Sequence, residues 1–285
     1  MALNIVIMAG GVGSRLYPLS TPEKPKQFLD LLNCGRSLLQ LTCERFAALE
    51  ASARIWIVTG AQYIPLVREQ LPDLPACQIL AEPCSRNTAP CIEYVCRKIE
   101  ALHGAGEKVV VSPSDAYIPD VQEFCATIRT ALDGCEGRIV TVGIHPTWPS
   151  PQYGYIHLGA AAGGIHKVEA FKEKPSTEVA ERYLAAGGYY WNAGIFVFEA
   201  GTMLDQIRTF APEISARFDS VPFGTPGEAA AVKANFPLCP KISIDYAVME
   251  KSPLVFCVPS DWPWDDLGSF EAIEKITGVN PLKQS

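Results

Sequence analysis

A cluster of glycines provides the strongest chemical signal in the chain. Gly10, Gly11 and Gly13 lie within Ala9-Gly10-Gly11-Val12-Gly13-Ser14, directly after the short apolar segment of residues 3–8. Because glycine has no side chain, such a segment can turn tightly and bring its backbone N–H groups against a phosphate. The pattern predicts a phosphate-binding turn, although an ordinary tight turn between a strand and a helix would also use glycine.

Two common phosphate-binding motifs are incomplete here. The dinucleotide pattern G-x-G-x-x-G, started at Gly11, requires glycine at the position of Leu16. The Gly-Lys-Ser/Thr ending of the Walker motif occurs nowhere in the chain. These differences weaken the hypothesis of an NAD-dependent dehydrogenase.

Two cations follow the glycines in a proline-rich segment. Arg15 comes directly after the turn, and Lys26 belongs to Lys24-Pro25-Lys26-Gln27-Phe28, with further prolines at positions 18 and 22. Arginine and lysine can neutralise charge that moves between the oxygens of a polyphosphate. A solvated cluster of surface charges is the alternative, but the prolines make this segment rigid for a surface loop.

Asp115 is a candidate metal ligand. It comes just beyond the apolar segment of residues 109–111, and open α/β sheets bind ligands at the carboxyl ends of their strands. Mg²⁺ prefers oxygen ligands and commonly uses one or two carboxylates together with substrate phosphates. An Asx-turn or a helix N-cap is the alternative role for this side chain.

The elements that position these residues alternate along the first half of the chain. The expected strands are residues 3–8, 55–58, 109–111 and 139–142, and the expected helices begin near Ser37, Thr88 and Val121. This alternation predicts an α/β fold with a Rossmann-like, doubly wound, mostly parallel sheet. Beyond about residue 145, prolines and shorter strands indicate an α+β lobe. We expect a single domain over residues 1–285, with one lobe at about 1–145 and the other at about 146–285.

Composition excludes several classes of protein. The chain has 285 residues, 48% of them hydrophobic, and a formal net charge of −7. This charge argues against a broad surface for nucleic acid or an anionic membrane, and no apolar stretch reaches the roughly 18 residues of a membrane span. The ten cysteines lack the spacing of a zinc site. We therefore expect reduced thiols and a cytoplasmic location.

Ordered motifs along the chain resemble the signature of the sugar-1-phosphate nucleotidylyltransferases. The matches run in order from residue 9 to residue 268, so chance does not explain them. They are residues 10–20, Pro25-Lys26-Gln27-Phe28-Leu29, Glu82-Pro83, Arg86-Asn87-Thr88-Ala89-Pro90, Pro113-Ser114-Asp115, Tyr153-Gly154-Tyr155-Ile156, Phe171-Lys172-Glu173-Lys174-Pro175, Trp191-Asn192-Ala193-Gly194-Ile195-Phe196, residues 243–250 and Trp264-Asp265-Asp266-Leu267-Gly268.

The resemblance implies a nucleotide-diphospho-sugar transferase fold and roles for the matched residues. The first lobe would bind the nucleotide through Ala9, Gly10, Gly11, Gly13, Ser14, Glu82, Asn87 and Thr88. The second lobe would bind the sugar phosphate through Gly154, Glu173, Lys174 and Asn192. Arg15 and Lys26 would be catalytic residues on the leaving pyrophosphate, and Asp115 and Asp266 would hold Mg²⁺.

Three points stay open within this resemblance. Asp265 could replace its neighbour Asp266 as the metal ligand, although the spacing Trp-x-Asp-x-Gly favours Asp266. Glu173 and Lys174 could form an ordinary solvated stretch of charge. The family often has histidine at the position of Ala116, which leaves the detail of the Asp115 loop in doubt.

The form Lys26-Gln27-Phe28 is most similar to family members that transfer GMP from GTP to α-D-mannose 1-phosphate, giving GDP-mannose and pyrophosphate. A sugar phosphate is already an anion at neutral pH, so in-line attack on the α-phosphate needs no general base. The alternatives are a relative that uses dTTP or UTP with a glucose-type sugar, and a catalytically inactive regulatory homologue. The expected partners are these small molecules, and a homodimer is left open. Few residues follow Gly268, so we expect no further domain within this chain, whether or not the natural chain continues beyond Ser285.

Overall fold

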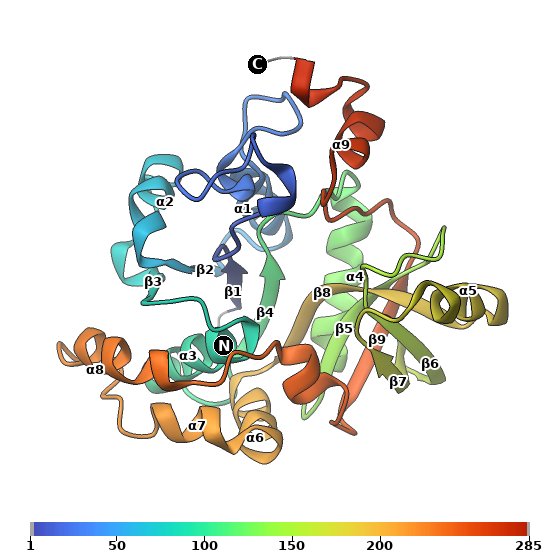
Figure 1. The fold of residues 1–285 in the computed structure, drawn as a ribbon. Helices are drawn as coiled ribbons and strands as arrows, with labels where there is room; N and C mark the ends of the chain where they lie inside the picture. The colour runs from blue at the N-terminus through green and yellow to red at the C-terminus, as the bar shows by residue number, and fades with distance from the viewer. Residues whose placement is uncertain (1–2, 284–285) are drawn as a thin grey trace.

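A nine-stranded mixed sheet organises residues 3–283, which are the residues that the structure, a computed structural model, describes. The strand order is β3-β2-β1-β4-β8-β5-β9-β7-β6, and β8 also pairs with β6 (Figure 1). The strands are β1 Asn4–Met8, β2 Arg54–Gly60, β3 Ile79–Glu82, β4 Lys108–Pro113, β5 Ile139–Ile144, β6 Tyr155–Ala162, β7 Ile165–Lys172, β8 Tyr189–Glu199 and β9 Val255–Ser260.

The first four strands of this order are parallel. β1 pairs with β2 and β4, and β2 pairs with β3, so the carboxyl ends of all four strands meet at one edge. The expected mostly parallel arrangement holds for these four strands, whereas the sheet as a whole is mixed, because β8 runs antiparallel between β4 and β5 and the pairs formed by β6 and β7 are antiparallel too. The α/β fold class is confirmed, and the antiparallel pairs are those of β6, β7 and β8.

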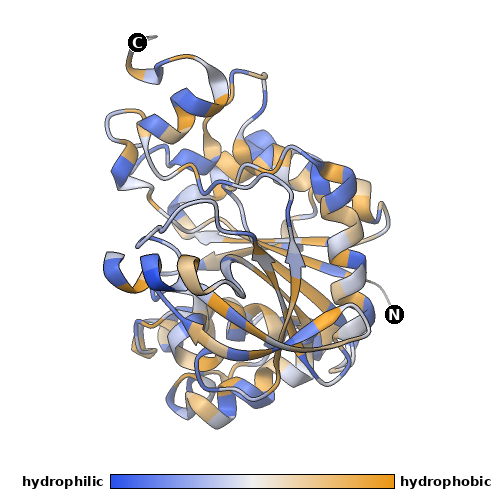
Figure 2. Cartoon of the chain, turned by 90° about the vertical axis from the view of Figure 1, so that its right-hand side faces the viewer, coloured by the Kyte–Doolittle hydropathy of each residue, from blue (hydrophilic) through white to orange (hydrophobic). Residues whose placement is uncertain are grey.

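Helices cover both faces of the sheet. Helices α3, α6 and α7 enclose one apolar core, and α1 and α4 enclose the other on the opposite face (Figure 1). Figure 2 shows the strands between these layers as mostly hydrophobic, whereas the outer helices alternate between polar and apolar residues. The helices are α1 Leu38–Leu49, α2 Ile64–Gln70, α3 Thr88–His103, α4 Val121–Gly134, α5 Thr177–Ala186, α6 Ala200–Phe210, α7 Pro212–Phe218, α8 Glu228–Asn235 and α9 Phe270–Thr277.

The local signals for helix starts are confirmed. Ser37 caps α1 in a complete capping box with Gln40, which satisfies backbone N–H groups that the first turn leaves free. Asn87 caps α3, and Asp120 accepts a hydrogen bond from the backbone of Glu123 at the start of α4. None of the helices between residues 3 and 283 combines the length and apolar character that a membrane crossing requires. The division into two lobes stays a prediction.

Candidate functional site

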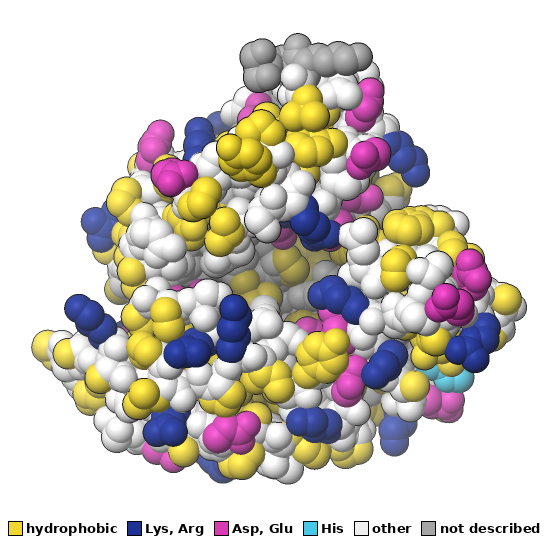
Figure 3. Space-filling model, in the orientation of Figure 1, with side chains coloured by type: hydrophobic (Ala, Val, Ile, Leu, Met, Phe, Trp, Pro, Cys, Tyr) yellow, Lys and Arg dark blue, Asp and Glu magenta, His cyan; other side chains and the backbone are white. Residues whose placement is uncertain are grey.

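A cleft lies across the carboxyl ends of β1, β3 and β4. It consists of two adjoining cavities of about 380 and 250 Å³ that share Met8, Thr88, Pro113 and Asp115 in their linings. Figure 3 shows the cleft as a hollow near the centre of the molecule, with Lys and Arg side chains along its margins. This is the edge at which open α/β sheets bind their ligands.

The glycine turn is fixed by the side chains around it. Gln27 is buried, and its Nε2 donates to the backbone oxygens of both Ala9 and Gly11 at 2.9 Å. Gly13 has φ +64°, a left-handed conformation that glycine adopts without strain. At Gly10, a Cβ atom would lie 2.7 Å from Glu82 Oε2. The glycine therefore lets the backbone and this carboxylate share one wall of the larger cavity.

Lys26 connects the two candidate metal ligands. Its Nζ lies 2.8 Å from Asp115 Oδ2 and donates to the backbone oxygen of Asp266 at 2.5 Å. The lysine side chain is only 7% exposed, so its charge is held inside the cleft rather than in solvent. Two segments that are far apart in sequence meet at this ammonium group.

Arg15 pairs with the second aspartate at the rim of the cleft. Its Nη2 lies 3.2 Å from Asp266 Oδ2, and its Nη1 donates to Gln152 Oε1 at 2.6 Å. The other carboxylate oxygen of Asp266 accepts from Tyr153 Oη at 3.2 Å and from the backbone N–H of Gly268 at 3.1 Å. Both aspartates therefore have a cationic partner within the chain.

The donor set at this position fits Mg²⁺. Asp115 and Asp266 line the same cavity and approach a common ammonium group, whereas no set of three or more His, Cys, Asp or Glu side chains among residues 3–283 is arranged to hold a metal. Two carboxylates suffice for Mg²⁺ when substrate phosphates and water complete its coordination. These residues could hold the ion once the cations move onto a phosphate.

Asp265 has a structural position instead. Its Oδ1 accepts from the backbone N–H of Leu267 at 2.7 Å, and its backbone pairs in both directions with Tyr117. Asp266, and not Asp265, is among the residues that line the cleft. This arrangement favours Asp266 over Asp265 as the metal ligand, as the spacing Trp-x-Asp-x-Gly predicts.

Glu82 contributes a carboxylate to the wall of the larger cavity. Burial raises the pKa of Glu82 to about 7, because the ionised form loses solvation in the cavity wall. Thr88 lies across the cavity, and its Oγ1 accepts from the backbone N–H of Ile244 at 2.8 Å. Asn87 adopts a positive φ of 67° at the amino end of α3, and its Oδ1 accepts from the backbone N–H of Thr88 at 2.9 Å.

Glu173 contributes a carboxylate to the smaller cavity. A Cβ atom on Gly154 would lie 2.5 Å from Glu173 Oε2, so the glycine gives this carboxylate its room. The backbone N–H of Glu173 donates to Glu250 Oε1 at 3.0 Å, and Lys174 Nζ lies 2.8 Å from Glu173 Oε1. The Lys174 side chain is 61% exposed and is not among the lining residues, so it reaches the site through its pairing with Glu173.

Asn192 is held in one orientation by neighbours on three sides. Its Oδ1 accepts from Thr141 Oγ1 and from the backbone N–H of Gly194, both at 3.1 Å. Its Nδ2 donates to Asp245 Oδ1 at 3.0 Å. Since the oxygen of Asn192 is already used, its available contribution to a ligand is the second N–H of its amide.

Asp245 is the residue that the sequence analysis did not select. Burial, reinforced by the charge of Glu173, raises the pKa of Asp245 to about 6. It lines the same cavity as Glu173 and Asn192, so two carboxylates and one amide face a common space. The sequence signal for Asp245 is its place in the motif Ser243-Ile244-Asp245-Tyr246.

The structure brings most of the expected site residues to the cleft. Those in its lining are Gly10, Gly11, Arg15, Lys26, Glu82, Asn87, Thr88, Asp115, Gly154, Glu173, Asn192 and Asp266. Ala9, Gly13, Ser14 and Lys174 are not in that lining. Ala9 is fully buried, and its backbone oxygen accepts from Gln27 and from Thr59, so its role in the site is to fix the turn.

Comparison with known proteins supplies independent information. The family model described as "Nucleotidyl transferase" matches residues 4–279. A mannose-1-phosphate guanylyltransferase of Sinorhizobium fredii is 37% identical over 276 residues, which cover 94% of this chain and 54% of that protein. The xanthan biosynthesis protein XanB of Xanthomonas campestris is 40% identical over 279 residues, which cover 95% of this chain and 59% of that protein.

A solved structure shows the same fold. The crystal structure described as a mannose-1-phosphate geranyltransferase from Thermus thermophilus superposes with a TM-score of 0.87 at 35% sequence identity, over 99% of this chain and 81% of that one. The present chain thus spans slightly more than half the length of the curated relatives that it matches.

Proposed function

Because the chain belongs to the nucleotidyl transferase family, we propose that it transfers GMP from GTP to α-D-mannose 1-phosphate and releases GDP-mannose and pyrophosphate. The observation that carries the proposal is the composition of one cleft. It contains the glycine turn, an ammonium group between two aspartates, and a cluster of two carboxylates and an amide. These three parts suit a triphosphate, a magnesium ion and a sugar, respectively.

The triphosphate would lie along the glycine turn. Backbone N–H groups of that turn would bind its oxygens, and Arg15 and Lys26 would move from the aspartates onto the phosphates. Mg²⁺ held by Asp115 and Asp266 would neutralise charge on the reacting phosphates. Each cation would then have exchanged a carboxylate for a phosphate, which keeps the charge of the buried Lys26 paired.

The base would lie in the larger cavity. Guanine presents the donors N1–H and N2–H₂ along one edge, and Glu82 would accept from them. Because its raised pKa reflects the cost of burying an unpaired carboxylate, a ligand that donates two hydrogen bonds would stabilise the ionised form.

The sugar would lie against Glu173, Asn192 and Asp245. The carboxylates accept hydrogen bonds from hydroxyl groups, and Asn192 donates one, so together they would orient the sugar phosphate toward the α-phosphate of GTP. The attacking phosphate oxygen is already ionised. Catalysis would therefore depend on positioning and charge neutralisation rather than on proton transfer.

A substrate grid tests this proposal. Pyrophosphate release is measured with GTP, ATP, UTP, CTP or dTTP, each paired with mannose 1-phosphate or glucose 1-phosphate, with Mg²⁺ and with EDTA. We expect GTP with mannose 1-phosphate to react fastest and EDTA to abolish release. Fastest release with dTTP or UTP and glucose 1-phosphate would assign a different nucleotidylyltransferase activity. No release from any pair would favour the inactive regulatory homologue.

A further inference from the structure

Helix α1 buries an arginine that lacks an anionic partner among the described residues. Arg45 is 5% exposed, and its guanidinium lies 5.5 Å from the ring centroid of Phe124. Its Nη2 donates a long hydrogen bond of 3.4 Å to the backbone oxygen of Ala116, and its buried Nε has no partner. Burying an uncompensated charge is costly, so a side chain in this position calls for a functional explanation.

Arg45 lines a separate cavity between α1 and the segment that follows β4. This cavity has a volume of about 430 Å³. Its walls are mainly apolar and include Leu32, Leu41, Ala48, Ile118, Pro119 and Val121. Glu44, the carboxylate in the lining, is already paired with Arg36 at 3.0 Å. Sites for small molecules commonly combine such apolar walls with a few polar groups.

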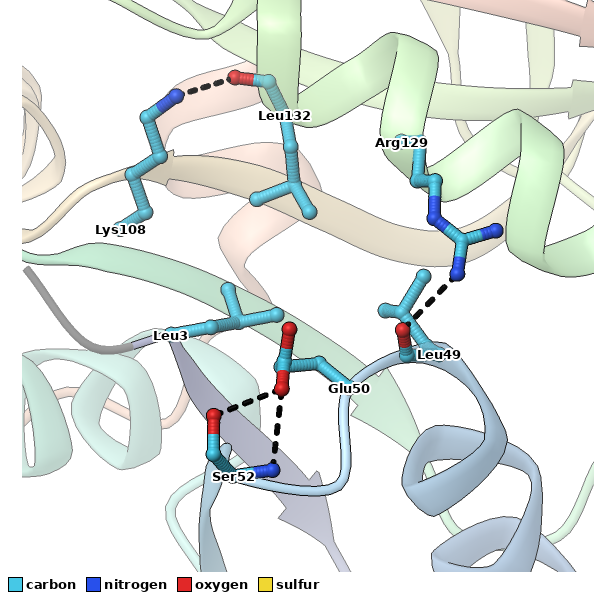
Figure 4. A pocket seen from close by; sticks show the side chains of 7 residues that line it. All are labelled: Leu3, Leu49, Glu50, Ser52, Lys108, Arg129 and Leu132. Carbon is cyan, nitrogen blue, oxygen red and sulfur yellow. Dashed lines mark hydrogen bonds between the residues drawn. The ribbon is translucent and has the colours of Figure 1, made fainter.

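Another cavity provides a useful contrast (Figure 4). It lies at the amino ends of β1 and β4, has a volume of about 290 Å³ and contains two cations. Lys108 Nζ donates to the backbone oxygen of Leu132 at 2.7 Å, and Arg129 Nη2 donates to that of Leu49 at 3.0 Å. Both cations make short hydrogen bonds and keep contact with solvent, so they do not pose the problem that Arg45 poses.

We propose that the Arg45 cavity is a second ligand site, which binds a small organic anion with a carboxylate or phosphate head on an apolar body. A guanidinium group binds either head through paired N–H donors, and the apolar walls would cover the body of the ligand. The retained positive charge supports this assignment, because burial lowers the pKa of Arg45 only to about 10. Arg45 is therefore charged at neutral pH.

The cavity is connected to the cleft by the segment that carries Asp115. Ala116, which accepts from Arg45, lines both the cavity and the cleft. The backbone N–H of Tyr117 donates to Asp265 O at 2.8 Å, and that of Asp265 donates to Tyr117 O at 3.2 Å. An anion that draws Arg45 away from Ala116 would thus act on the segments of both candidate metal ligands. This coupling rests on the proposed function, whereas the binding of an anion does not.

Binding is tested with benzoate and phenyl phosphate, and with benzamide as the neutral analogue of benzoate. Isothermal titration calorimetry on the whole chain should show that both anions bind. Benzamide should bind more weakly than benzoate by about tenfold or more, as expected for loss of a charge-assisted hydrogen bond. Equal affinity for benzamide, or absence of benzoate binding, would overturn the proposal.

A pair of substitutions on α1 locates the binding. Ala48 is exposed and lines the cavity, whereas the adjacent Ala47 is exposed and does not. Ala48→Leu should weaken benzoate binding by about tenfold, because the larger side chain occupies apolar space, and Ala47→Leu should leave it unchanged. Arg45→Gln should also abolish binding. If that variant does not fold, the Ala48 and Ala47 pair still decides, since equal affinities in the pair would place the anion elsewhere.

Coupling is tested separately. Thermodynamic linkage is reciprocal. If a ligand in the cleft changes the affinity for benzoate by some factor, benzoate must change the affinity for that ligand by the same factor. We expect the dissociation constant of benzoate to shift when Mg²⁺ and GTP are added together, and an unchanged constant would refute the coupling alone. If the chain released no pyrophosphate from any substrate pair, the proposed function would fail. The comparison of benzoate binding to the wild type and to the Ala48→Leu variant would still show whether the Arg45 cavity binds an anion.

Discussion

The ammonium group of Lys26 lies 2.8 Å from Asp115 and within hydrogen-bond distance of the backbone of Asp266, so one buried cation occupies the position between the two candidate metal ligands. This arrangement joins the side chain of Asp115 to the backbone of Asp266 through a single ammonium group. It also places a cation where charge would develop during transfer of a nucleotidyl group.

Replacing Lys26 should impair catalysis strongly. Lys26→Met removes the cation proposed for the leaving pyrophosphate, and kcat should fall by about 100-fold or more, the usual effect of losing one preorganised donor. Steady-state pyrophosphate release measures the effect. Lys24→Met in the same segment is the control, since Lys24 is exposed. A Lys26 variant with the turnover of the control would remove Lys26 from the mechanism.

Asp266→Asn should raise the Mg²⁺ concentration required for half-maximal activity and lower kcat strongly. The amide keeps the size of the side chain and can still accept from Gly268, so the fold should be retained. Magnesium titrations of pyrophosphate release, together with circular dichroism, separate the two effects. Asp261→Asn is the control on an exposed aspartate of the preceding segment. Near-normal turnover and magnesium dependence in the Asp266 variant would reject the metal site.

Glu82→Gln should weaken GTP binding and leave mannose 1-phosphate binding nearly unchanged. A neutral amide oxygen accepts hydrogen bonds from guanine less strongly than a carboxylate does, and charge-assisted bonds contribute roughly 1.5–3 kcal/mol. The KM for each substrate is measured at saturation of the other, with Glu69→Gln as an exposed control. Equal effects on the two substrates would reject the assignment of the base site.

The same substitution should change stability in a pH-dependent way. The pKa of Glu82 is raised from 4.5 to about 7 in the folded state, so its contribution is most favourable below pH 4.5 and is lost as pH rises through 7. Glu82→Gln should therefore stabilise the substrate-free protein at pH 8, by up to about 3 kcal/mol, and have little effect near pH 5. Urea unfolding at the two pH values measures this difference. A stabilisation that is the same at both values would contradict the raised pKa.

Asp245→Asn should raise the KM for mannose 1-phosphate with little change in the KM for GTP. The new amide can still accept from Asn192 through its oxygen, so the loss would be the charge and one acceptor toward the sugar. Kinetics with each substrate varied separately test this, and Asp219→Asn on an exposed aspartate is the control. An unchanged KM for the sugar phosphate would leave Asp245 with a structural role.

Many elements of the fold could be predicted because their signals are local. Ser37 with Gln40 forms a capping box over four residues, and the three consecutive valines of β4 lie between two segments with a helical pattern. The position of β8 between β4 and β5 could not be predicted in this way. Pairing between strands depends on contacts far apart in the chain, and the apolar pattern of a buried strand does not name its neighbours.

The individual roles within the site were predictable to a smaller degree. The resemblance names Asn192 as a ligand of the sugar phosphate, but it does not show that Thr141 and Gly194 already use the oxygen of this side chain. Asp245 and Arg45 gave no separate signal, because burial and missing partners are properties of the packed chain. Residue type alone does not show which hydrogen-bonding groups are still available.

By itself, the sequence determined the chemistry that this protein can offer: a glycine turn for phosphate, cations beside it, and aspartates for a metal, in an order typical of one family. Only the tertiary structure decided that Lys26 lies between Asp115 and Asp266, that Asp245 shares a cavity with Glu173, and that Arg45 is buried without an anionic partner among the described residues. Local conformation follows from neighbouring residues. Distances between segments, and the charge that burial leaves uncompensated, arise only when the whole sheet has folded.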